Sequence, residues 1–126
     1  MRIAIIGCTE STRCFINGIL KDNDYEIVGI FTLEDKYAYK KSRFALLDDI
    51  AYANKINLYK IKKINDAKIV QLIKELEPDI ILESGWSQII PKEVLKIPPK
   101  GCIGIHYSFL PKNQGAASLN WALIKG

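Results

Sequence analysis

Short apolar runs alternate along the chain with longer stretches in which apolar residues recur at helical spacing. Runs rich in Ile, Val and Leu are typical of buried parallel strands, and spacings of three and four residues are typical of helices that cover one face of a sheet. The pattern predicts five strands, at residues 2–7, 25–32, 56–61, 79–82 and 101–105. It predicts five helices, at residues 11–20, 43–54, 65–77, 91–95 and 116–125. Residues 33–42 are polar and predicted to be irregular.

Residues that start or stop a helix support these boundaries. Pro78 ends the third predicted helix, and Asn65 is a candidate N-cap at its start. Pro91 is suited to the first turn of the fourth helix because proline has no backbone N–H to satisfy there. A strand therefore alternates with a helix along the whole chain.

This alternation predicts the α/β class, with a doubly wound, Rossmann-like parallel sheet and helices on both faces. Right-handed crossovers favour the strand order 3-2-1-4-5. In such sheets the loops that follow the first, fourth and fifth strands line one crevice. We therefore expect the loops around Thr9, Trp86 and His106 to meet.

Composition agrees with one soluble domain. The chain has 126 residues, of which 48% are hydrophobic and 25% charged, and a formal net charge of +4. The N-terminus lacks the features of a signal peptide, and no apolar run approaches the roughly 20 residues that span a bilayer. We expect a cytoplasmic protein without membrane contact. The spread of the lysines indicates solvated faces, or attraction to an anionic substrate. The sequence has no basic stripe with interleaved aromatic residues, which argues against a nucleic-acid partner.

The three cysteines have no spacing typical of a zinc site, and their odd number argues against a disulfide framework. Cys8 follows the first strand, but the chain has no second histidine to activate it as a nucleophile.

Two of the three loops have both a structural and a functional interpretation. Thr9, Ser11 and Thr12 are able to hold an anion with the helix amides, although Ser11 or Thr12 more simply caps the helix. The glycine pattern of a dinucleotide site is missing there. Residues 85–90 combine a glycine, Trp86 and two isoleucines, which suits a flat heterocycle, or core packing beneath the next helix.

His106 is the only histidine in the chain, and it stands where the fifth strand, which is predicted to be buried, runs into a loop. Its imidazole is able to change charge near neutral pH. With no evident carboxylate partner, it is not part of a serine-type triad. It is suited to donate a hydrogen bond to an oxyanion or to shuttle a proton.

Residues 83–126 resemble the folate-dependent formyltransferase family. The similarity lies in Gly104-Ile105-His106, in Ser108-Phe109-Leu110-Pro111 and in Gly115-Ala116-Ala117, and it extends to the segment 85–94. It continues more weakly to the first strand. The resemblance implies that residues 1–126 are the N-terminal, catalytic domain of such an enzyme, incomplete at its C-terminal end.

The resemblance also implies the chemistry. The formyl donor would be 10-formyltetrahydrofolate, no metal would be needed, and His106 would stabilise the tetrahedral oxyanion during transfer to an amine. The residues implied in donor binding are Trp86, Gln88, Ile89 and Ile90. Those implied around the acceptor are Thr9, Ser108, Lys112, Asn113, Gln114 and Gly115.

Two departures from the family pattern matter. The family's asparagine beside the formyl oxygen corresponds to Gly104, so its side-chain donor would have to come from elsewhere, for example Asn113. The family's catalytic aspartate would follow residue 126. The chain as given is therefore expected to show no appreciable turnover, and a non-catalytic, folate-binding remnant of the fold is an alternative.

The acceptor is a second open question. The segment 33–42 lacks the basic Arg/Lys-Gly run typical of methionyl-tRNA formyltransferases, which favours a nucleotide-linked amino sugar as acceptor and leaves the tRNA enzyme as the alternative. The fifth strand would present an unpaired edge, and such edges invite pairing with a second chain. We therefore expect a homodimer, or aggregation, through this edge.

Overall fold

The computed structural model describes residues 1–106, 108, 110–112 and 123–124. Its centre is a five-stranded parallel sheet with the order β3-β2-β1-β4-β5, which confirms the predicted doubly wound α/β fold. The strands are β1 (Arg2–Ile6), β2 (Glu26–Leu33), β3 (Leu58–Ile61), β4 (Ile80–Glu83) and β5 (Cys102–Gly104). The helices are α1 (Glu10–Ile19), the 3₁₀ helix η1 (Asp35–Lys40), α2 (Asp48–Ala53), α3 (Ala67–Glu75) and α4 (Lys92–Leu95).

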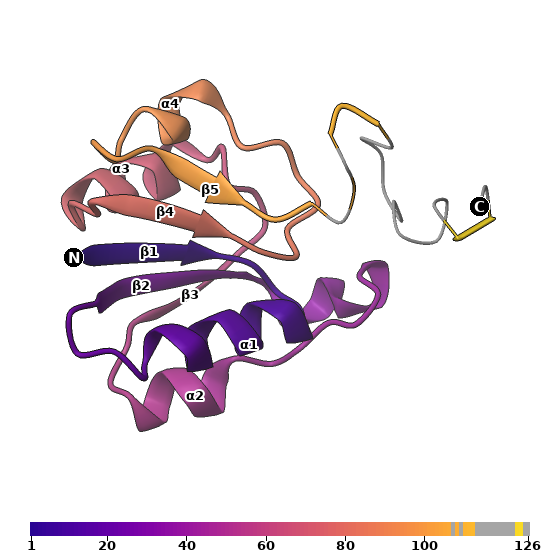
Figure 1. Ribbon diagram of the computed structural model, residues 1–126, viewed down its shortest axis with the longest axis horizontal. Helices are drawn as coiled ribbons and strands as arrows, with labels where there is room; N and C mark the ends of the chain where they lie inside the picture. The colour runs from indigo at the N-terminus through magenta and orange to yellow at the C-terminus, as the bar shows by residue number, and fades with distance from the viewer. Residues whose placement is uncertain (107, 109, 113–122, 125–126) are drawn as a thin grey trace.

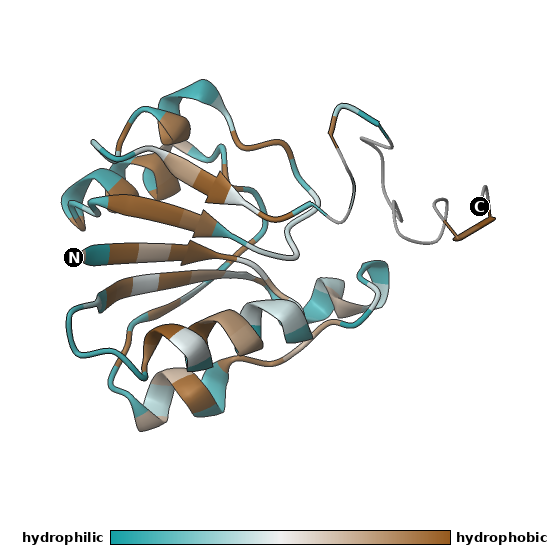
Figure 2. Cartoon of the chain, viewed as in Figure 1, coloured by the Kyte–Doolittle hydropathy of each residue, from teal (hydrophilic) through white to brown (hydrophobic). Residues whose placement is uncertain are grey.

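The sheet is covered on both faces. On one face, Ile16 of α1 and Ile50 of α2 pack against Ile3 and Ile5 of the central strand. On the other, Ile73 of α3 and Val94 of α4 pack in the cluster that contains Ile6. Figure 1 shows α1 and α2 in one layer and α3 and α4 in the other, and Figure 2 shows the apolar strands between them. All strands point the same way, so the loops that follow them gather at one edge.

The second predicted helix is shorter than expected. Residues 43–47 precede α2 rather than form its first turns, because Phe44 bridges to Thr9 and the Ala45 N–H donates to the Cys8 carbonyl. Arg43 has a positive φ of 58°, which is incompatible with a continuous right-handed helix. The segment 33–42, predicted to be irregular, contains the end of β2 and η1.

The third helix has a different N-cap from the one predicted. Asp66, not Asn65, caps α3: its carboxylate accepts the Lys68 N–H at 2.9 Å. A side-chain oxygen at this position satisfies an N–H that has no partner inside the helix.

The fifth strand corrects another expectation. It was predicted to be buried, yet Ile103 is 55% exposed and Gly104 and His106 are exposed as well. Among the described residues, β5 pairs only with β4, and helices cover it on one face, where Cys102 packs. The predicted helix at residues 116–125 lies largely outside the described residues.

Candidate active site at the carboxyl edge of the sheet

The loops after β1 and β4 touch because two glycines allow it. A side chain at Gly7 would collide with the Ser84 carbonyl and with Thr12, and one at Gly85 would collide with Thr9. Gly85 also has a φ of +73°, which non-glycine residues rarely adopt. These close contacts bring the first and fourth loops together, as the strand order predicted.

A network of hydroxyl groups joins these two loops. Thr12 donates to the Ser84 carbonyl at 2.5 Å and accepts the Thr9 N–H at 3.1 Å. The hydroxyls of Thr9 and Ser11 lie 2.8 Å apart, and Ser84 donates to Ser11 at 3.1 Å. Thr9 is the N-cap of α1, not Ser11 or Thr12 as expected. Thr9 is only 7% exposed, so its hydroxyl serves the loop itself.

Cys8 belongs to the same packed region. It is buried, and its Sγ donates to the Gly85 carbonyl at 3.4 Å. Burial raises the pKa of the Cys8 thiol, the nearby positive charge of Lys41 opposes that rise, and Glu83 adds to it. A buried thiol with a raised pKa is a poor nucleophile, in agreement with the sequence analysis.

The segment 86–90 presents polar backbone beside apolar side chains. Trp86 and Ile90 pack against the core cluster that contains Val94, whereas Ile89 is 92% exposed. Within the described residues, the backbone groups of residues 87–90 form no hydrogen bond with the protein, and the buried Trp86 Nε1 has no partner. Unpaired donors next to an indole are what a flat, polar-edged ligand requires.

Gln88 has a structural role that the sequence did not reveal. Its side-chain oxygen accepts the Ile64 N–H at 3.1 Å, and its amide nitrogen donates to the Lys62 carbonyl at 2.7 Å. The side chain therefore fastens this segment to the loop after β3. Both polar atoms of the Gln88 side chain are thus engaged, which leaves the backbone of Gln88 for a ligand.

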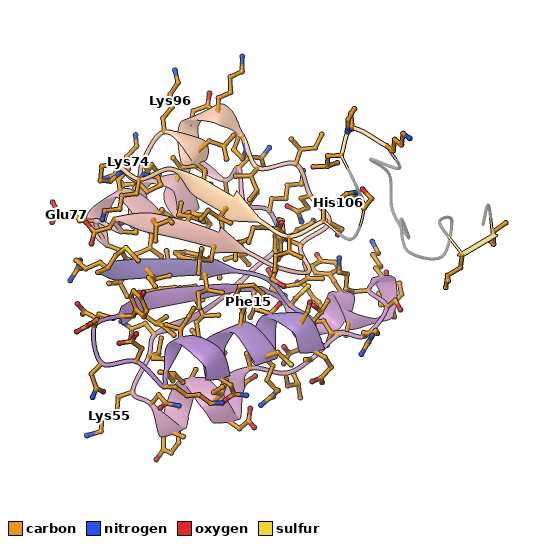
Figure 3. All side chains as sticks on the ribbon, viewed as in Figure 1. Phe15, Lys55, Lys74, Glu77, Lys96 and His106 are labelled. Atoms are coloured by element: carbon orange, nitrogen blue, oxygen red, sulfur yellow. The ribbon has the colours of Figure 1, made fainter. Side chains whose placement is uncertain are left out.

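His106 lies just beyond β5, at the edge where the loops meet (Figure 3). The structure supplies a carboxylate that the sequence analysis did not find: Glu83, the last residue of β4. Burial raises the pKa of the Glu83 carboxyl and outweighs the Trp86 N–H, Lys41 and His106, which all lower it. The sequence did contain one indication of this carboxylate, which is an acidic residue at the end of an otherwise apolar strand.

The remaining predicted site residues are only partly described. Ser108 has a buried Oγ with no hydrogen-bond partner among the described residues, and Lys112 is exposed. Asn113, Gln114 and Gly115 lie outside the described residues.

Lysines surround an aromatic ring on the segment after β2. The ammonium groups of Lys36, Lys40 and Lys62 lie 5.2, 5.4 and 5.8 Å from the centre of the Tyr37 ring, within the range of cation–π contacts. Lys41 follows directly and acts electrostatically on Cys8 and Glu83. This basic cluster, Lys36, Lys40, Lys41 and Lys62, therefore extends to the loops of the candidate site.

A hollow on the surface lies away from this chemistry. It is lined by residues that include Lys74, Glu77 and Lys96, which Figure 3 shows at the end of the molecule opposite His106. The described residues contain no group of three side chains suited to bind a metal ion. None of their helices is long and apolar enough to cross a membrane.

Comparison with known proteins shows which proteins this chain is similar to in sequence. The chain is 37% identical to the methionyl-tRNA formyltransferase of Clostridioides difficile (strain 630) over 128 residues, which covers 100% of this chain and 41% of that protein. It is also 37% identical to the enzyme of the same name from Alkaliphilus metalliredigens, covering 40% of it. The chain thus spans about two fifths of the length of these relatives.

Solved structures share the fold at lower identity. Glycinamide ribonucleotide transformylase 1 from Geobacillus kaustophilus superposes with a TM-score of 0.77 at 15% identity, covering 99% of this chain and 68% of that one. A formyltetrahydrofolate deformylase from Pseudomonas syringae gives 0.75 at 19% identity, covering 99% and 42%. The sequence profile described as "Formyl transferase" matches residues 1–126. The chain belongs to the formyl transferase family.

Proposed function

We propose that this protein transfers a formyl group from 10-formyltetrahydrofolate to a primary amine. The observation that carries the proposal is the meeting of the 86–90 segment, Glu83 and His106 at one edge of a formyl transferase fold. The donor is a co-substrate. Its pterin would lie against Trp86, with hydrogen bonds from the backbone of Gln88, Ile89 and Ile90, whose polar groups have no protein partner within the described residues.

His106 would act on the reacting carbon. When the amine attacks the formyl group, the carbonyl oxygen becomes an oxyanion, and a hydrogen-bond donor placed there stabilises the transition state more than the ground state. His106 is exposed at the strand end, which suits contact with a substrate. Ser108, Lys112 and residues 113–115 would face the acceptor, while the buried hydroxyl of Thr9 would support the loop rather than contact it.

For the acceptor, we propose methionyl-tRNA first. The relatives at 33–37% identity carry that name, and the basic cluster beside Tyr37 suits a phosphate-rich partner. A nucleotide-linked amino sugar is the second candidate, because the segment 33–42 lacks an Arg/Lys-Gly run. Its diphosphate is anionic as well, so charge alone does not separate the two.

The test uses the protein expressed from its complete reading frame. Calorimetry with a stable 10-formyltetrahydrofolate analogue should show saturable 1:1 binding, and transfer of labelled formyl should be measured to methionyl-tRNA and, separately, to a nucleotide-linked amino sugar. His106→Ala is expected to keep donor binding and to lower kcat by about 10²–10³-fold, as for loss of one oxyanion donor.

The outcomes separate the acceptors. Formylation of methionyl-tRNA alone supports the first acceptor, and formylation of the amino sugar alone supports the second. Absence of donor binding and of transfer to both would contradict the proposed function and favour a non-catalytic remnant of the fold.

A further inference from the structure

The Glu83 side chain lies in space that Gly104, on the neighbouring strand β5, leaves open because glycine has no side chain. In the register of the sheet, Glu83 of β4 is the partner of Gly104 of β5. A Cβ atom at position 104 would lie 2.9 Å from Glu83 Oε2, closer than such contacts normally occur. The other carboxylate oxygen, Oε1, accepts the Trp86 N–H at 2.8 Å. The carboxylate is therefore held at one oxygen and directed toward the glycine at the other.

Groups from three segments act on this carboxylate: Trp86 follows β4, Lys41 follows η1, and His106 follows β5. The charge of Glu83 in turn raises the pKa of Cys8, which follows β1. Burial disfavours the ionised form and prevails over the Trp86 N–H, Lys41 and His106, which favour it. A half-buried carboxylate with a raised pKa, next to a histidine in a loop cluster, is a typical environment for proton transfer.

We propose that Glu83 is the proton acceptor for N-formylation in this protein, and that Gly104 is glycine because the carboxylate occupies the space of a side chain there. This inference rests on the proposed function. The amine nitrogen forms the new C–N bond to the formyl carbon, and the carbonyl oxygen takes the negative charge. The ammonium proton passes to Glu83 Oε2. The bond from the formyl carbon to folate N10 then breaks, and N10 takes the proton back from Glu83.

The primary test compares Glu83→Gln with the parent protein, each from the complete reading frame, in single-turnover transfer to the acceptor found active above. The variant is expected to lose about 10²–10⁴-fold in rate, as for removal of a general base, with unchanged affinity for the folate analogue. The parent rate should rise with pH as the Glu83 carboxyl ionises, and this limb should be missing in the variant. A variant that keeps the parent rate and its acid limb would overturn the inference.

A glycine substitution tests the placement without changing charge. Gly104→Ala should displace the carboxylate and lower the transfer rate, whereas Gly18→Ala, where an added Cβ would meet nothing within 4 Å, should leave the rate unchanged. Equal rates for both variants and the parent would contradict the role assigned to Gly104.

The third readout does not depend on turnover. Carbon-13 titration of the Glu83 carboxyl should show a higher pKa in His106→Gln than in the parent, because the imidazole favours the ionised form. An unchanged Glu83 pKa would show that His106 does not act on the Glu83 carboxyl and would overturn this part of the inference.

Absence of transfer by the parent would overturn the proposed function and this proton transfer together. Transfer that survives Glu83→Gln unchanged would overturn the present inference alone.

Discussion

At the scale of single residues, glycine decides how closely the loops of the candidate site approach. Gly85 and Gly101 share a positive φ, +73° and +80°, but differ in their surroundings: a Cβ at Gly85 would collide with Thr9, and one at Gly101 would meet nothing within 4 Å. Alanine substitution at the two positions therefore separates the cost of backbone strain, present at both, from the cost of crowding, present only at Gly85. The two positions provide a matched pair of substitutions.

Gly101→Ala is expected to lower the free energy of unfolding by about 1–2 kcal/mol, the cost of a left-handed conformation for a residue with a Cβ. Gly85→Ala should cost about 1–3 kcal/mol more, since the Thr9 side chain must also move. Urea denaturation of both variants measures the difference. Equal losses would show that the contact between Thr9 and Gly85 does not constrain the loops.

At the scale of elements, buried hydroxyl groups connect α1 to the end of β4. Thr12 and Thr32 are both buried, at 0% and 2% exposure, yet only Thr12 is bonded: within the described residues the Thr32 hydroxyl has no partner. Thr12→Val would leave the Ser84 carbonyl and the Thr9 N–H without their partner. A buried polar group that loses its hydrogen-bond partner costs more free energy than a hydrogen bond contributes on balance, because the group is not returned to water.

Thr12→Val should therefore destabilise the fold by about 1–3 kcal/mol, and the same substitution at Thr32 should be neutral or stabilising. Thermal and urea unfolding of the two isosteric variants gives the comparison. Similar losses in both would mean that shape, rather than hydrogen bonding, determines stability at these positions.

The elements also show what the sequence can and cannot predict. Strand order followed from alternation and handedness, because apolar runs and helical spacing are local properties. Tertiary pairing overrode the local pattern at Phe44, whose apolar spacing is helical but whose backbone bridges to Thr9. The exposure of Ile103 depends on what covers the outer face of β5, and the pairing of Glu83 with Gly104 depends on the register between two neighbouring strands. No local pattern contains either piece of information.

At the scale of the whole molecule, the sheet ends in an apolar edge as far as the described residues go. β5 is the last strand in the order, Ile103 is 55% exposed and Ile105 is 36% exposed. An edge strand offers a row of backbone donors and acceptors to a second chain, and exposed isoleucines add apolar area to such a contact. We therefore expect the chain of residues 1–126 to self-associate through β5.

Sedimentation equilibrium should show a concentration-dependent dimer of this chain. Ile103→Lys should weaken association at least tenfold, since one buried isoleucine contributes about 1.5–3 kcal/mol and about 1.4 kcal/mol equals a factor of ten. Ile89→Lys is the control: Ile89 is 92% exposed but lies outside the strand, so its substitution should leave association unchanged. A monomer at millimolar concentration, or equal effects of both lysines, would exclude β5 as the contact, because only a strand-edge interface distinguishes these two isoleucines.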